Sequence, residues 1–368
     1  MLIEEILELC ISKNASDLHI SAGLPPVLRI DGKLVRTDLS VLTGDDVETI
    51  VFPILTNEQR RNLEQHWELD FGYGIHGLGR FRVNVYKDKG NYAAAFRSIN
   101  SEVPSFESLG LPDIVKQVAE KPRGLVLVTG PTGSGKSTTL ASMIDYINET
   151  RTEHILTIED PIEYVHHSKK SIVHQRELGQ DTRSVANALR SALREDPDII
   201  LVGEMRDLES IALALTAAET GHLVFGTLHT SSAAQTIDRI IDVFPDVQQQ
   251  QVRIQLSNSL VAVFSQTLLP KLSEDGRTKK GRVMAQEIMV VTPAISNLIR
   301  EQKAAQIYSA IQTGVALGMQ TLDMSLKDLY KKKLITYDDA ITKCAYPEEL
   351  KRMLGMTTNN SPLMGGNT

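Results

Sequence analysis

The chain has 368 residues, of which 42% are hydrophobic and 23% are charged, as is ordinary for a soluble globular protein. This length predicts two domains, and the apolar content suffices for two cores. The net charge of −7 argues against a nucleic-acid-binding protein, because such proteins usually carry a basic footprint. The two cysteines stand far apart in the sequence and predict neither a metal site nor a disulfide framework.

The sequence shows no membrane-spanning pattern, because no apolar run reaches the ~18 residues that a spanning helix needs. Its first five residues, Met-Leu-Ile-Glu-Glu, are acidic and do not resemble the basic start of a signal peptide. We therefore expect a cytoplasmic protein.

Residues 1–100 carry the pattern of a small α+β domain. An apolar face at helical spacing predicts a helix over 2–12, and residues 43–66 also have a helical pattern. One face of the accompanying antiparallel sheet is expected to be exposed. Alternating apolar residues predict its strands at 18–20, 28–30, 68–73, 79–86 and 92–97.

Three arginines, Arg80, Arg82 and Arg97, lie on these predicted strands. Arg80 and Arg82 share one face of their strand, because side chains two residues apart point the same way. They could form a solvated basic face, or they could contact a phosphate, which a planar guanidinium group suits well. The residues alone leave both interpretations open.

Residues 101–122 contain three prolines around one short amphipathic segment, which predicts an interdomain linker or hinge. From residue 123 to 355, strands alternate with helices, as is typical of an α/β domain with a doubly wound sheet, and short helices end it. Residues 356–368 are polar and rich in Gly and Pro, so we predict a disordered tail there.

The segment from Gly130 to Ser137 matches G-x-x-x-x-G-K-[ST], the P-loop pattern. A buried strand is predicted before it and an amphipathic helix after it, which is the context that a phosphate-binding loop requires. Lys136 would reach the β- and γ-phosphates and the Ser137 hydroxyl would bind Mg²⁺, so we predict ATP and Mg²⁺ as cofactors. The predicted nucleotide contacts are Gly130, Pro131, Thr132, Gly133, Ser134, Gly135, Lys136, Ser137 and Thr138.

Two further strands are predicted to end in acidic residues. Glu159, Asp160 and Glu163 follow the first, and they could hold Mg²⁺ through water or position the attacking water. The second apolar run ends at Gly203 and Glu204, which is the Walker B pattern of a buried strand that delivers a carboxylate. Glu204 is therefore the predicted residue that activates water.

A last apolar strand, predicted over 223–228, is bracketed by His222 and His229. His229 follows the carboxyl end of the strand and is the better candidate to contact a γ-phosphate. A lone histidine at such a position is more often structural, but beside a phosphate loop and a strand that ends in an acid both histidines are candidates, and His222 is also a predicted nucleotide contact.

Taken together, these segments resemble the secretion ATPase superfamily, and most closely its type IV pilus retraction ATPases. The resemblance runs over residues 1–350 in the family's order. It implies a homohexameric ring of N-terminal PAS-like domains and C-terminal RecA-like P-loop NTPase domains, with ATP between the two. The segments that carry it are 15–19, 130–137, 158–164, 189–198, 203–207 and 226–230.

The resemblance also assigns roles to residues and partners. It implies that Arg82 and Arg97 act as sensors or fingers on the phosphates, and it extends less clearly to Arg80. It further implies a motor that docks on an inner-membrane platform protein at the cytoplasmic face of that membrane. In the family's terms, Glu159, Asp160 and Glu163 form the Asp box, Glu204 is the Walker B acid, and His222 and His229 form the His box.

Residues 294–301, Ala-Ile-Ser-Asn-Leu-Ile-Arg-Glu, are similar to the signature of the retraction ATPases, in which Arg usually stands where this chain has Ser296. Extension and type II secretion ATPases usually carry a longer N-terminal region and a four-cysteine zinc element, and this sequence matches neither. Three alternatives stay open: a paralogous pilus or secretion ATPase, a DNA-transfer ATPase, and a regulatory nucleotide-binding module without useful turnover.

Overall fold

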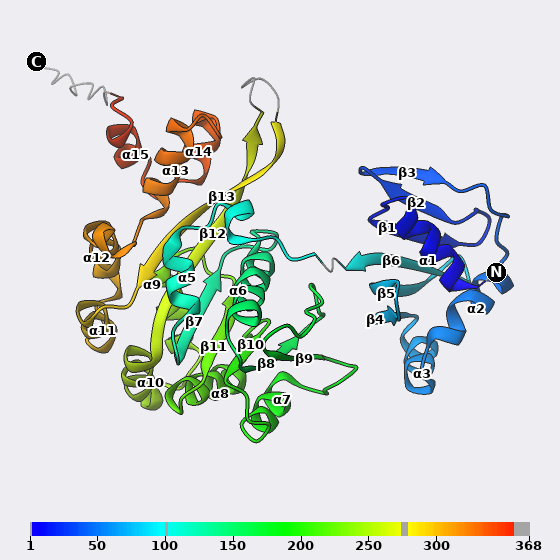
Figure 1. Cartoon of the computed structure of the whole chain (residues 1–368), viewed down its shortest axis with the longest axis horizontal. Coiled ribbons are helices and arrows are strands. Elements are labelled where there is room, and N and C mark those ends of the chain that lie inside the picture. Colours follow the sequence, from blue (N-terminus) through cyan, green and yellow to red (C-terminus); the bar gives the residue numbers. More distant parts are fainter. Residues whose placement is uncertain (1, 100–101, 274–278, 357–368) are drawn as a thin grey trace, which may run out of the picture. The chain divides into compact units, whose positions relative to one another are not determined.

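The computed structural model describes residues 2–99, 102–273 and 279–356 (Figure 1). The chain divides into two compact units. The first comprises the chain up to Val103 together with Ile158–His167 and Gln175–Ala188, and the second comprises the remainder. The tail predicted over 356–368 lies outside the described residues, except for its first residue.

The first unit is built on a six-stranded antiparallel sheet of order β3-β2-β1-β6-β5-β4. Helix α1 supplies Ile3, Ile6, Leu7 and Cys10 to a core that also contains Phe81 and Phe96 of the sheet. The strands are β1 (Asp17–Ser21), β2 (Val27–Ile30), β3 (Lys33–Arg36), β4 (Glu68–Ile75), β5 (Gly79–Asp88) and β6 (Asn91–Ile99). The helices are α1 (Ile3–Ser12), α2 (Gly44–Val51), the 3-10 helix η1 (Phe52–Ile54) and α3 (Asn57–His66).

Local chemistry sets the ends of these elements. Thr43 and Thr56 begin α2 and α3, and each threonine hydroxyl accepts a hydrogen bond from the backbone N–H three residues on, at 3.2 Å. The side chains of Asp46 and Gln59 return the bond to the cap backbone, so both helices start with a capping box. The predicted strands and helices of residues 2–99 all occur, with small shifts at their ends.

The second unit is centred on a seven-stranded mixed sheet of order β13-β12-β7-β11-β10-β8-β9. Strands β12, β7, β11 and β10 are parallel neighbours, whereas β13 pairs with β12 in the antiparallel direction. The carboxyl ends of β8 and β9 are counted with the first unit. The strands are β7 (Gly124–Thr129), β8 (His154–Glu159), β9 (Ile172–Glu177), β10 (Ile199–Val202), β11 (Leu223–Leu228), β12 (Leu260–Leu272) and β13 (Lys279–Val290).

One face of this sheet presents Val126, Phe225 and Phe264, which pack against Met143 and Ile147 of α6. Helix α8 packs against β7 and β11. The helices up to residue 259 are α4 (Phe106–Leu109), α5 (Asp113–Ala119), α6 (Lys136–Thr150), α7 (Val185–Ala192), α8 (Leu208–Glu219), α9 (Ala233–Asp242) and α10 (Asp246–Ser259). After the sheet follow α11 (Pro293–Arg300), η2 (Ala304–Gln306), α12 (Ile307–Thr313), η3 (Val315–Leu317), α13 (Leu322–Lys331), α14 (Tyr337–Lys343) and α15 (Pro347–Met353).

The structure differs from the predicted domain limits in two places. Half of the segment predicted as a linker forms α4 and α5, and Phe106, Val115 and Val118 belong to the core of the second unit. The prolines therefore mark the ends of short helices, and the change of unit falls between Val103 and Pro104. In addition, the segments around the predicted Asp box group with the first unit, although they lie inside the span predicted for the ATPase domain.

None of the helices in the described ranges is long and apolar enough to cross a membrane.

Candidate functional site

The phosphate loop follows β7, and its glycines fit their positions closely. Gly133 and Gly135 have φ values of 77° and 88°, in the left-handed region that favours glycine. A Cβ on Gly130 would lie 2.3 Å from the carbonyl oxygen of Gln266 and 2.6 Å from Ser134 Oγ. The backbone therefore favours glycine at 133 and 135, and at 130 a side chain would clash.

The loop has the donors that a nucleotide phosphate requires. Its residues lead directly into α6, so backbone N–H groups at the helix N-terminus are available to an anion. The Lys136 ammonium donates to the carbonyl oxygens of Gly130 and Pro131, at 2.8 and 3.2 Å. Ser134 Oγ is buried and has no hydrogen-bond partner among the described residues. These residues fit a phosphate, and Ser137 lies in the first turn of α6, where its hydroxyl could meet a phosphate-bound Mg²⁺.

A buried glutamine on β12, Gln266, holds the backbone of the phosphate loop. The sequence did not predict this contact. Gln266 Nε2 donates to the carbonyl oxygen of Ser134 at 2.9 Å, and Gln266 Oε1 accepts from Thr139 Oγ1 at 3.1 Å. Gln286 Nε2 donates to the same Oε1 at 3.2 Å. The signal in the sequence was Gln266 in the short polar stretch 265–267, which interrupts an otherwise apolar run, because a buried amide needs partners.

The parallel strands β7, β11 and β10 bring three predicted site segments to one edge of the sheet. Thr129 pairs with Leu228, and Val202 pairs with Gly226, so the phosphate loop, His229 and Glu204 all follow carboxyl strand ends. Ligands bind at this edge in sheets of this kind.

Glu204 is held on both carboxylate oxygens. Oε1 contacts His229 Nε2 at 2.9 Å and Arg206 Nε at 2.8 Å, and Oε2 accepts from Arg206 Nη2 at 2.8 Å. The hydrogen bond from Arg206 and the charges of His229 and Arg206 outweigh desolvation and lower the pKa of Glu204. Glu204 is thus ionised at neutral pH, as a base that takes a proton from water must be. Arg206 was not predicted, although it stands only two residues after Glu204.

The structure does not bring His222 to this edge. His222 precedes β11, its Nδ1 lies 2.9 Å from the carbonyl oxygen of Ala217, and its own carbonyl accepts from Gly124 at the start of β7. The six extended residues of β11 separate His222 from His229, and they span about 20 Å. His222 thus lies at the amino end of its strand, away from the edge that carries the phosphate loop and Glu204, and its role in the His box stays a prediction.

The three acids of the predicted Asp box lie in the first unit: Glu159 is the last residue of β8, and Asp160 and Glu163 lie on the loop that follows. Glu159 Oε1 accepts from Gln175 Nε2 at 3.1 Å, whereas Asp160 and Glu163 are exposed. The Asp160–Pro161 peptide is cis. Among residues 2–99, 102–273 and 279–356, no group of three or more His, Cys, Asp or Glu side chains is placed to hold a metal ion.

The three predicted arginines separate into two kinds. Arg82 and Arg97 lie directly opposite each other on β5 and β6, and both are exposed. Arg97 Nε donates to Asp17 Oδ1 at 2.8 Å, and Arg82 Nε lies 3.9 Å from Asp70 Oδ1. Arg80, in contrast, donates to a buried glutamate on β9. Like charges placed opposite each other repel, so this pair suits a site that receives an anion.

Comparison with known proteins identifies the family. The sequence profile described as "Type II/IV secretion system protein" matches residues 96–331. The chain belongs to this family. It is 58% identical to the type IV pilus retractation ATPase PilT of Pseudomonas aeruginosa, over 94% of this chain and 99% of that protein. It is 54% identical to a twitching motility protein of Neisseria gonorrhoeae, over 88% of this chain and 86% of the relative.

The secretion family also accounts for the fold. A crystal structure of the pilus retraction motor PilT with bound ADP superposes with a TM-score of 0.88 at 53% identity, covering 96% of this chain and 99% of that one. The resemblance noted in the sequence is thus confirmed, and so is the predicted α/β fold. The phosphate loop, Glu204 and His229 all lie inside the segment that the family profile covers.

Proposed function

We propose that this chain is the ATP-hydrolysing motor that retracts type IV pili and so drives twitching motility. One observation carries the proposal: a chain that aligns over nearly its whole length with a pilus retractation ATPase has its phosphate loop, Glu204 and His229 at one sheet edge. A nucleotide-sensing module alone would not need a carboxylate that can activate water.

The residues at this edge would divide the work as follows. The loop N–H groups and Lys136 bind the phosphates, and Lys136 would leave the carbonyls of Gly130 and Pro131 to do so. ATP supplies the phosphoanhydride bond that is cleaved, and the Ser137 hydroxyl would hold a Mg²⁺ ion, which would supply positive charge to its phosphates. Glu204 takes a proton from the attacking water, and His229 holds its Oε1 oxygen in place.

We further propose that Arg82 and Arg97 contact nucleotide phosphates, and that Glu163 orients water or water-bound Mg²⁺. The supporting observations are the opposed, exposed guanidinium groups and the exposed Glu163 carboxylate on the loop after β8. The guanidinium groups of Arg82 and Arg97 are accessible to a ligand, because neither side chain is buried.

The assembly that suits this activity is a homohexamer in the cytoplasm. It would dock on the platform protein of the pilus at the inner membrane, because a protein that pulls a filament needs an anchored partner. No nucleic acid is required, and the net charge of −7 agrees with that.

A genetic test with a matched control decides the function. Deletion of the gene is expected to leave cells hyperpiliated and unable to twitch, and wild-type protein should restore both properties. Glu204→Gln should restore neither and should lower ATP turnover about 10²-fold or more. The control, Glu348→Gln, removes an exposed carboxylate of α15 and should behave as wild type.

Other outcomes would contradict the proposal. Cells without pili would indicate an extension motor, and unchanged twitching would indicate an accessory paralogue. ATP turnover stimulated by single-stranded DNA, and lost as salt rises, would indicate a DNA-transfer ATPase.

A further inference from the structure

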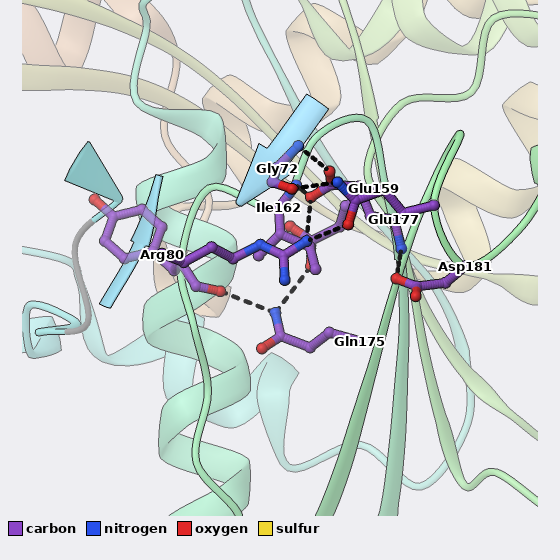
Figure 2. Close-up of polar contacts among 9 residues, drawn as sticks. Gly72, Arg80, Glu159, Ile162, Gln175, Glu177 and Asp181 are labelled. Carbon is purple, nitrogen blue, oxygen red and sulfur yellow. Dashed lines mark hydrogen bonds and ion pairs between the residues drawn. The ribbon is translucent and has the colours of Figure 1, made fainter. Parts of the chain in front are cut away.

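Glu177 is a buried carboxylate at the end of β9, and only 2% of it is exposed. Its two oxygens accept three hydrogen bonds from separate segments (Figure 2). Oε1 accepts from the Gly72 N–H at 3.0 Å, and Oε2 accepts from Arg80 Nη2 at 2.8 Å and from the Ile162 N–H at 3.1 Å. We call Gly72, Arg80, Ile162 and Glu177 the latch.

The latch is built closely around its glycine. A Cβ on Gly72 would lie 2.6 Å from Glu177 Oε1 and 2.9 Å from Arg80 Nη2, so any larger residue would displace the carboxylate. Gln180 adds a second link, since its Nε2 donates to the Gly72 carbonyl and its Oε1 lies 3.4 Å from Arg80 Nη2. The strands β4 and β5 of the small sheet thus bind the end of β9.

The same cluster holds the acidic loop, residues 159–164. Gln175 Nε2 donates to Glu159 Oε1 at 3.1 Å and to the Tyr164 carbonyl at 2.9 Å, while Ile162 is bound by Glu177 (Figure 2). Ile162 is also buried, which fixes the middle of the loop. The two charged side chains between these contacts, Asp160 and Glu163, are exposed.

We propose that the latch positions the acidic loop, so that Glu163 moves with the small antiparallel sheet rather than with the phosphate loop. Glu177 and Arg80 are then positioning residues, and a displacement of the small sheet changes where the Glu163 carboxylate stands. This inference rests on the proposed function in one respect, which is that Glu163 takes part in ATP hydrolysis. A carboxylate whose donors are all supplied by the protein is costly to release, so the loop follows the sheet.

The first measurement uses the full-length protein without nucleotide. Glu177→Gln is expected to speed hydrogen exchange at residues 159–164 and at 70–82 by about 10-fold or more, because the latch opens locally. Exchange in α6 should stay as in wild type. The control, Glu64→Gln, breaks an exposed ion pair with Arg60 on α3 and should change neither region.

A second measurement separates positioning from mere structural support. Glu177→Gln should lower kcat about 10-fold or more while the KM for ATP stays within about 3-fold, because the phosphate loop is untouched. In a Glu163→Gln background, the same change should cause no further loss of single-turnover cleavage. A structural role would lower cleavage in both backgrounds.

Gly72→Ala provides an independent route if Glu177→Gln folds poorly. It should reproduce the loss in wild type but add little to Glu177→Ala, in which the carboxylate that the new methyl group meets is gone. The latch proposal would be wrong if Glu177→Gln left hydrogen exchange at 159–164 unchanged. It would also be wrong if the losses of ATP cleavage caused by Glu177→Gln and Glu163→Gln multiplied in the double variant. If the wild-type protein did not hydrolyse ATP, the proposed function would be refuted. Hydrogen exchange would still test whether the latch holds the acidic loop, because it is measured without nucleotide.

Discussion

The edge of the large sheet that carries the phosphate loop and the face of the small sheet that carries Arg82 and Arg97 are built in different ways. At the edge, the loop rests on buried polar side chains such as Gln266 and Thr139, and its shape comes from glycine backbone. On the face, Arg97 and Arg82 have 71% and 49% of their side chains exposed and contact single aspartates. The first site is preformed, whereas the second can exchange its partners with little reorganisation.

The largest effect is expected at the preformed edge. Lys136→Ala removes the ammonium group that is proposed to bind the phosphates, so ATP turnover should fall about 10²-fold or more and nucleotide binding should weaken. A phosphate-release assay and a fluorescent-nucleotide titration measure the two effects. Lys303→Ala, which removes an exposed lysine paired with Glu301, is the matched control. Normal turnover in Lys136→Ala would show that this edge is not the nucleotide site.

An intermediate effect is expected on the small sheet. If Arg82 and Arg97 bind phosphates as proposed, Arg82→Ala and Arg97→Ala should each lower kcat by about 10-fold, because each would remove one charge-assisted contact. Arg82→Ala should change stability little, since its ion pair with Asp70 is exposed and such pairs contribute about 0–1 kcal/mol. Arg97→Ala should be the less stable of the two, because it removes a hydrogen-bond donor from the buried Asp17. Arg60→Ala, an exposed arginine of α3, should keep full activity. If all three variants turned over ATP equally, the arginine face would be only a solvated surface.

The smallest effect concerns the pH dependence of the preformed edge. Arg206 is the main reason that the pKa of Glu204 is low, so Arg206→Ala should raise it and move the acid limb of the kcat profile to higher pH. The pair's contribution to folding is present above the carboxyl's unfolded pKa and is lost as pH falls through its lowered folded pKa. Turnover measured between pH 4 and 8 tests this, and an acid limb that stays in place would contradict it.

Sequence patterns predicted most elements of the small sheet, because one face of that sheet is buried and the other exposed. Phe81, Val83 and Val85 alternate with polar neighbours, because every second side chain of β5 faces the buried side of the sheet. The hairpin of β12 and β13 was not predicted, since β12 is apolar on both faces along much of its length. Apolar runs of this kind do not distinguish a buried strand from a buried helix.

The sequence by itself determined the phosphate loop, Glu204 and His229, because each follows an apolar strand and parallel strands bring their carboxyl ends to one edge. Only the tertiary structure decided which residues support them. Gln266 reaches the loop from a strand more than a hundred residues away, and Glu177 binds two backbone N–H groups whose positions no local pattern records. Such contacts depend on how distant segments pack, which periodicity along the chain does not specify.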